Sequence, residues 1–224
     1  MTGGRDTASL RPVVVTGGGD HSGVIIDALL TCGVSIRGLC DPSLSVGSCG
    51  PHGVPVLGGD RALEDMDPAE IRLVNGIGSV SAPKLRASVF SRLKGLGFEF
   101  ASVLHPSATL ARDVVLGEGS QIMAGSVVQS AAIIGDNVLI NTSASIDHHC
   151  RIGTSAHIAP GAVLSGSVTV GEGTHVGPGA RVIQNIVIGE NVIVGAGVTV
   201  LAGIPAGTTV HPMKTPVWAG PPKS

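Results

Sequence analysis

The sequence predicts a small Rossmann-like α/β domain followed by a parallel β-helix made of hexapeptide repeats. Two observations support this fold class. One position, read in steps of six from Leu104 to Val200, is always Leu, Ile or Val. Upstream of it, a β-branched run leads through a glycine-rich turn into a helical pattern, as in nucleotide-binding α/β units. A period of six fits neither an α-helix nor one long strand, but it fits a repeated strand-and-corner unit.

The repeat keeps its register over its whole length. The position two before each aliphatic residue is mostly small or β-branched, and the position after it is often Gly. Three hexapeptides make one coil, so residues 18 apart should stack at the strand spacing of about 4.8 Å. The aliphatic positions, which we expect to point into a narrow core, are Leu104, Leu110, Leu116, Ile122, Val128, Ile134, Ile140, Ile146, Ile152, Ile158, Leu164, Val170, Val176, Val182, Ile188, Val194 and Val200.

The composition agrees with this fold. Among 224 residues there are 34 Gly and no Tyr, and aromatic residues make up 2%, as expected for a prism too thin to hold rings. Mean hydropathy is +0.42, yet no apolar run approaches the roughly 20 residues of a membrane span. A net charge of −2 gives no basic footprint for nucleic acid. We therefore expect neither a membrane nor a nucleic-acid partner.

The four cysteines (Cys32, Cys40, Cys49 and Cys150) show no zinc-like pairing, and the chain opens without a signal-peptide pattern. Both features favour a reducing, cytoplasmic location.

The elements follow in order. Residues 1–12 are polar and aperiodic, which indicates a mobile leader. Residues 13–103 should form the α/β domain, 104–206 the β-helix and 207–224 a proline-rich tail, and we expect the α/β domain to cap one end of the prism. Within the α/β domain, strands are predicted over 13–16, 34–40, 54–58 and 71–77, and helices over 24–30, 61–66 and 83–94.

The glycine-rich turn departs from the dinucleotide fingerprint. Gly17 and Gly19 match its first two glycines, but Ser22 occupies the third position, so a complete dinucleotide site is not expected. Either the glycines only make a tight turn, or the amides and His21 hold a phosphate at a helix N-terminus. Asp41 ends the second strand, at the sheet edge where open α/β sheets bind ligands.

One hexapeptide block breaks the bland pattern of small residues. It runs over 141–151 and carries Asn141, Asp147 and His148. The coil period places Gly166 one coil beyond His148. It also places His175 one coil beyond His157, and we expect these two histidines to stack on a corner.

This block, together with His21 in a glycine-rich N-terminal unit, resembles the hexapeptide-repeat nucleotide-sugar acetyltransferases. These comprise UDP-4-amino-sugar and GDP-perosamine N-acetyltransferases and the related sialic acid O-acetyltransferases. The resemblance implies a left-handed β-helix and a homotrimer that binds acetyl-CoA between neighbouring prisms. It assigns His148 as the catalytic base, with Asn141 and Asp147 beside it. It implies a nucleotide-sugar site at Gly17, Gly19, His21 and Asp41, and an acetyl-CoA site at His157, Gly166 and Lys214.

The chemistry of the residues is consistent with acetyl transfer to an amine. A histidine with a pKa near 6.5 can accept the proton of the attacking amine at neutral pH. The amide of Gly166 could stabilise the oxyanion. Asp147 could orient the imidazole, although adjacent strand residues point to opposite faces. Cys150 occupies the inward position of its repeat, which favours a core thiol over a nucleophile.

Other interpretations remain open. A hydroxyl acceptor needs the same base, so O-acetylation of a sugar is an alternative. A zinc site of the γ-carbonic anhydrase type is disfavoured, because His148, His149, His157 and His175 lack the spacing of two histidines five apart. A non-catalytic prism is a further alternative. Nothing in the sequence separates uridine, guanosine and thymidine carriers.

Overall fold

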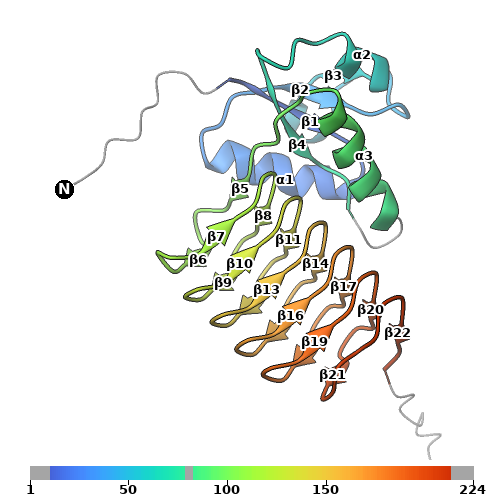
Figure 1. Ribbon diagram of the computed structural model, residues 1–224. Coiled ribbons are helices and arrows are strands. Elements are labelled where there is room, and N and C mark those ends of the chain that lie inside the picture. The colour runs from blue at the N-terminus through green and yellow to red at the C-terminus, as the bar shows by residue number, and fades with distance from the viewer. Residues whose placement is uncertain (1–10, 79–82, 213–224) are drawn as a thin grey trace, which may run out of the picture.

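The computed structural model describes residues 11–78 and 83–212. Most of the expected leader and of the expected tail, including Lys214, lies outside the described residues. The described chain forms an α/β unit that sits at one end of a long three-sided β-helix (Figure 1).

The N-terminal sheet is parallel, with strand order β3-β2-β1-β4. The central run Val13–Thr16 is β-branched throughout and buried, and Val13, Val14 and Val15 are fully shielded from solvent. The strands are β1 (Val13–Thr16), β2 (Ile36–Cys40), β3 (Val56–Gly58) and β4 (Arg72–Asn75), and the helices are α1 (Asp20–Thr31), α2 (Asp60–Glu64) and α3 (Pro83–Gly95), with a single 3₁₀ turn η1 (Pro51–Gly53).

Helix α1 begins four residues earlier than the apolar pattern predicts. Gly19 is its N-cap, and the amide and hydroxyl of Ser22 both bond to the Gly19 carbonyl, at 2.9 and 2.7 Å. Local hydrogen bonds therefore wind the polar residues 20–23 into the first turn. This brings His21 onto the helix.

The β-helix has three faces made of two-residue parallel strands. The first face contains β5 (Val103–Leu104), β8 (Gln121–Ile122), β11 (Leu139–Ile140), β14 (His157–Ile158), β17 (His175–Val176), β20 (Ile193–Val194) and β22 (Thr209–Val210). The second contains β6 (Thr109–Leu110), β9 (Val127–Val128), β12 (Ser145–Ile146), β15 (Val163–Leu164), β18 (Arg181–Val182) and β21 (Thr199–Val200). The third contains β7 (Val115–Leu116), β10 (Ile133–Ile134), β13 (Arg151–Ile152), β16 (Thr169–Val170) and β19 (Val187–Ile188).

The predicted coil period is confirmed, since Ile140 pairs with Ile158 and Ile146 with Leu164, each 18 residues on. From Ile122 onward the recurring aliphatic position is buried in one continuous core. Leu104 departs from this expectation, because it is 41% exposed at the open end of the first coil, where no earlier coil covers it. The last coil is shortened: β22 pairs with β20 at a spacing of 16 residues, so pairing extends beyond residue 206, as far as Val210.

The α/β unit sits at the N-terminal end of the prism, where it packs on the first face of the opening coils. Helix α1 contacts β5, and its apolar side shares a buried cluster with Val103, Met123 and Leu139 of the first face (Figure 1). This packing carries the carboxyl edge of the N-terminal sheet toward the histidines of β14 and β17.

Candidate active site

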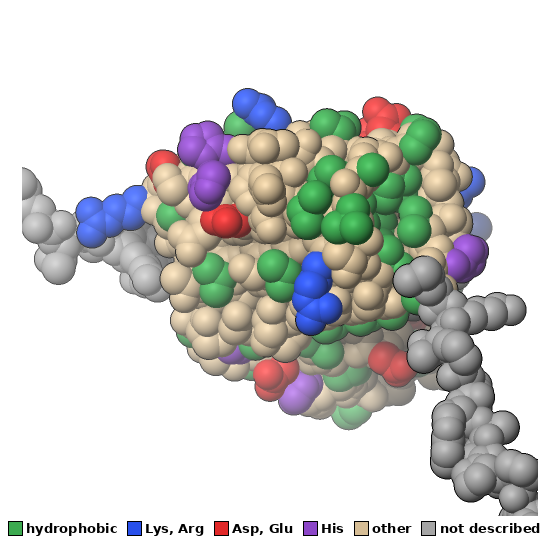
Figure 2. All heavy atoms as spheres, turned by 90° about the horizontal axis from the view of Figure 1, so that it is seen from below, with side chains coloured by type: hydrophobic (Ala, Val, Ile, Leu, Met, Phe, Trp, Pro, Cys, Tyr) green, Lys and Arg blue, Asp and Glu red, His purple; other side chains and the backbone are tan. Residues whose placement is uncertain are grey.

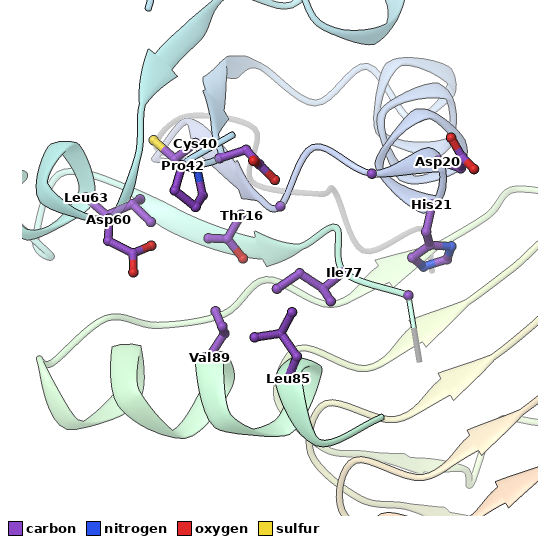
Figure 3. A pocket seen from close by; sticks show the side chains of 14 residues that line it. Thr16, Asp20, His21, Cys40, Pro42, Asp60, Leu63, Ile77, Leu85 and Val89 are labelled. Atoms are coloured by element: carbon purple, nitrogen blue, oxygen red, sulfur yellow. The ribbon is translucent and has the colours of Figure 1, made fainter. Parts of the chain in front are cut away.

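A cavity of about 590 Å³ opens at the carboxyl edge of the N-terminal sheet, where open α/β sheets bind ligands. Its volume is in the range of small-molecule sites. Figure 3 shows Asp60 and Leu63 of α2 on one side, Leu85 and Val89 of α3 below, and His21 toward the β-helix. The predicted residues Gly17, Gly19, His21 and Asp41 all line this cavity, together with Thr16, Asp20, Cys40, Pro42, Ile77 and Gly78.

The two candidate glycines differ in what they do. Gly17 has a φ of +91°, and a Cβ there would lie 2.4 Å from Ile77 Cγ1, so the backbone itself requires glycine. At Gly19 no atom lies within 4 Å of an added Cβ, so space is open at the cavity wall. Gly19 caps α1 without a side-chain hydrogen bond, and α1 therefore presents backbone amides to an incoming group.

Asp41 shapes the turn beside the cavity. It accepts hydrogen bonds from the amide of Gly18, at 2.6 Å, and from the amide and hydroxyl of Ser43. Partial burial opposes ionisation, but these hydrogen bonds win and hold the pKa of Asp41 below its ordinary value. The carboxylate is therefore charged at neutral pH and has part of its accepting capacity already in use.

His21 joins the cavity to the β-helix. Its Nε2 lies 3.3 Å from Oε1 of Gln121 on β8, and Gln121 Nε2 donates to the carbonyl of Asn75 at 2.6 Å. Burial and then the charge of Arg86 lower the pKa of His21 to about 4, although the Gln121 contact acts in the opposite direction. His21 is thus a neutral imidazole at neutral pH, suited to hydrogen bonding rather than to charge pairing.

A second group of predicted residues lies on the first face of the prism. His157 is 3% exposed, and its Nε2 lies 3.1 Å from Nδ2 of Asn141. The ring of His175 meets that of His157 edge-on at 4.8 Å, on paired strands β14 and β17. The 18-residue stacking is confirmed, but both histidines stand on a face and not on a corner. Burial and then the charges of His175, Arg86 and His21 lower the pKa of His157 to about 2.

His148 and Gly166 meet at a different place, the corner between the second and third faces. A Cβ at Gly166 would lie 2.5 Å from Cε1 of His148, so the imidazole rests directly on the Gly166 backbone. Among the described residues, no acceptor is found for the Gly166 amide, and its carbonyl accepts from Asn185. The coil arithmetic thus brings together the two residues to which the resemblance assigns a base and an oxyanion donor.

The partner of the His148 ring is one that sequence reasoning missed. Nδ1 of His148 lies 3.0 Å from Nδ1 of His149, whereas Oδ1 of Asp147 accepts from the backbone amide of His148 at 2.8 Å. His149 has a φ of +59°, which turns its ring toward His148 at the corner. The signal that could have indicated this partner is the corner position of His149. Polar residues with a positive φ recur at that position at 18-residue spacing, at Ser167 and Asn185.

Cys150 is in the core, as its repeat position indicated. It is fully buried, its thiol donates to the carbonyl of Ser165 at 3.3 Å, and burial raises its pKa. Both the burial and the raised pKa disfavour a thiolate nucleophile.

The candidate residues therefore form two groups within one chain. His21, Asn141 and His157 belong to the first face and the cavity beside it, while Asp147, His148 and Gly166 form the corner between the other two faces. The hydrogen bonds and ring contacts described above stay within each group. In the described part of the chain, no helix is long and apolar enough to span a membrane, and no cluster of three acidic, Cys or His ligands could hold a metal ion.

The neutral state of the two buried histidines predicts how stability depends on pH. An unfolded chain protonates a histidine near pH 6.5, whereas the folded chain keeps His21 neutral to about pH 4 and His157 to about pH 2. Between pH 4 and 6.5 the unfolded state binds more protons, so the free energy of unfolding rises with pH. On acidification through this window we expect a loss of up to about 1.4 kcal/mol per pH unit for each histidine.

Urea titrations at several pH values between 4 and 7 measure this slope. The variant His157→Asn should flatten the slope, because it removes one of the groups whose pKa burial lowers, the others being His21 and His175. An unchanged slope in that variant would show that His157 is not the source.

Comparison with known proteins supports the fold and identifies the family. The profile of the bacterial transferase hexapeptide family (six repeats) matches residues 131–166 and 167–202. A variant of perosamine N-acetyltransferase from Caulobacter crescentus, solved with CoA and GDP-perosamine, is 36% identical. The match covers 91% of this chain and 95% of that one, with a TM-score of 0.84. The acetyltransferase domain of PglB from Neisseria gonorrhoeae is 32% identical over 91% and 97% of the two chains, with a TM-score of 0.85.

No curated protein sequence gives a significant match. The fold, the repeat and the polar corner define a hexapeptide-repeat acyltransferase with an N-terminal α/β domain, and the predicted left-handed β-helix fold class is confirmed. The extent and identity of the structural matches make the particular group clear. The chain belongs to the hexapeptide-repeat nucleotide-sugar acetyltransferase family and is an acyltransferase.

Proposed function

We propose that this protein transfers an acetyl group from acetyl-CoA to the amino group, at C4, of a nucleotide-linked amino deoxy sugar. The observation that carries the proposal is the contact of the His148 imidazole with the Gly166 backbone. It occurs in a chain whose structural match covers 95% of the length of a perosamine N-acetyltransferase. That relative was solved with CoA and GDP-perosamine, and the PglB domain was also solved with acetyl coenzyme A.

The residues at the corner suggest how the proton moves. When Nδ1 of His148 donates to Nδ1 of His149, Nε2 of His148 carries the lone pair and can accept a proton. The amine nitrogen attacks the thioester carbonyl carbon as its proton passes to His148. Collapse of the tetrahedral species breaks the C–S bond, and the imidazolium returns the proton to the departing CoA sulfur. The Gly166 amide, for which no acceptor is found among the described residues, would donate to that oxyanion.

The nucleotide sugar would occupy the cavity of the α/β unit. The open wall at Gly19 and the amides of the α1 N-terminus suit a diphosphate, and the charged Asp41 suits a hydrogen-bond donor of the base or ribose. His21 stands between this cavity and the β-helix, where it can contact the sugar.

We further propose a homotrimer, because the two groups of site residues are separate within one chain. A neighbouring prism that docks its His148 corner against the first face would bring the groups together. Exposed apolar side chains on the other two faces, among them Val115, Val163 and Val187, are suited to such packing. Figure 2, which shows the molecule from below, shows hydrophobic side chains gathered on one part of the visible surface.

Mixing two inactive variants tests the shared site. Chains carrying His148→Asn and chains carrying His157→Asn would be unfolded together and reassembled. If the site forms between chains, random assembly should return about one quarter of wild-type turnover, because one interface in four then holds both histidines. Variants reassembled separately serve as the controls. Failure of the mixture to exceed their average would place the whole site within one chain.

A thiol-release assay tests the reaction itself. Purified protein and acetyl-CoA would be combined with UDP-, GDP- and dTDP-linked 4-amino sugars and with the corresponding hydroxyl sugars. Release of CoA thiol with an amino sugar would support N-acetylation and identify the carrier. Turnover only with a hydroxyl sugar would replace the proposal with O-acetylation, and silence across all of them would refute it.

A further inference from the structure

Arg86 is a buried cation whose setting the reaction does not explain. It lies in α3, is 1% exposed, and points into the junction between the α/β unit and the β-helix. Its Nη1 donates to the carbonyl of Ile77 at 2.8 Å and to that of Asn75 at 3.3 Å, and its Nη2 donates to the carbonyl of Asn137 at 3.4 Å. It therefore ties the end of β4 to a turn of the prism.

No carboxylate compensates this charge within the described residues. The ion pairs there join Arg11 to Glu99, Arg92 to Asp60 and Glu64, and Lys94 to Glu118, and Nε of Arg86 has no hydrogen-bond partner. Buried charges are normally paired, because desolvation of a single ion costs several kcal/mol. Burial lowers the pKa of Arg86 to about 9, which still leaves the guanidinium charged at neutral pH.

The junction around Arg86 connects directly to the candidate sugar site. The side chains of Asn75 and Asn137 are hydrogen-bonded at 3.1 Å, and Gln121 links the Asn75 carbonyl to His21. Ile77, whose carbonyl Arg86 holds, forms part of the cavity wall, as do Leu85 and Val89 on the same helix. The cavity lining contains Asp20, Asp41 and Asp60 but no Lys or Arg.

A diphosphate in such a cavity would meet these carboxylates and no cation among the described lining residues. Two guanidinium groups contact the wall from behind: that of Arg92 is neutralised by Asp60 and Glu64, whereas that of Arg86 is bound to the Ile77 carbonyl and has no carboxylate partner among the described residues. Low-dielectric surroundings weaken a charge less than water does, so a buried cation acts over a longer distance than an exposed one.

We propose that Arg86 is a positioning residue of the nucleotide-sugar site: its guanidinium fixes the cavity wall against the β-helix, and its charge, which no carboxylate among the described residues pairs, attracts the diphosphate. This inference rests on the proposed nucleotide-sugar substrate. Arg86 does not contact the reacting atoms, so its effect should fall on binding of the anionic carrier.

Calorimetric binding of GDP and UDP, compared with the uncharged nucleosides guanosine and uridine, tests this assignment. In Arg86→Met we expect the diphosphate that binds the wild type to bind about tenfold more weakly, with a flatter dependence on salt. Nucleoside affinity should stay within about twofold. Arg86→Lys should keep most of the diphosphate affinity, because it keeps the charge. Lys94→Met is the matched control, since it removes a cation of α3 that is already paired with Glu118.

The possible results separate the electrostatic role of Arg86 from the proposed function of the protein. Unchanged diphosphate affinity in Arg86→Met, or an equal loss for nucleoside and diphosphate, would overturn the electrostatic role. If Arg86→Met does not fold, the wild type and Arg86→Lys still decide, because salt-independent diphosphate binding in both would also overturn it. Absence of any nucleotide binding by the wild type would instead refute the proposed function on which the inference rests.

Discussion

Replacing His148 with Asn should lower kcat by a factor of about 10²–10⁴, the usual cost of a missing general base. Asparagine keeps a polar group of similar reach at this exposed corner but cannot accept the amine proton at neutral pH. The corner should keep its backbone, because the Asp147 carboxylate bonds the amide of residue 148 and not its ring. We therefore expect loss of turnover without loss of folding. Steady-state kinetics with both substrates saturating, together with the size of the oligomer in solution, measures both.

His52→Asn is the matched control, since His52 is an exposed histidine in η1 that does not line the cavity. Its kcat should stay within about twofold of wild type. A His148→Asn enzyme with near-normal kcat would remove His148 as the base, and it would leave acetyl transfer to depend on positioning alone.

Gly166→Ala should lower kcat by about 10²-fold through steric displacement of His148. The added methyl would lie 2.5 Å from Cε1 and 2.7 Å from Nε2 of the imidazole, closer than these atoms can approach. The ring is at the end of an exposed side chain and can swing away, so stability should change little. A displacement of about 1 Å at a catalytic group can cost 10²-fold in rate. Kinetics and thermal unfolding of the same sample separate the two effects.

A double-mutant cycle makes this test specific. In chains that already carry His148→Asn, the Gly166→Ala change should cost much less than in wild type, because no imidazole remains to be displaced. Gly95→Ala is the control, since no atom lies within 4 Å of its added Cβ. Full additivity of the two changes would show that Gly166 acts independently of His148, for example through its amide.

Much of the fold and half of the candidate site follow from the sequence. The six-residue aliphatic period is a local pattern, and the three-strand coil converts it directly into contacts 18 residues apart. The pairing of Ile140 with Ile158, the stacking of His157 on His175 and the meeting of His148 with Gly166 all follow from that one rule. The same regularity explains why Cys150 could be placed in the core.

The way the α/β unit meets the prism depends on contacts between residues far apart in the sequence. Nothing local distinguishes Arg86 from the other cations of α3, and its burial depends on that helix packing against the turn at Asn137, 51 residues away. The neutral state of His157 and the contact between His21 and Gln121 depend on the same long-range packing. The β-helix and its polar corner can therefore be predicted from the sequence, because the periodicity that produces them is local. The polar junction and its unpaired charge arise from non-local burial, which no spacing encodes.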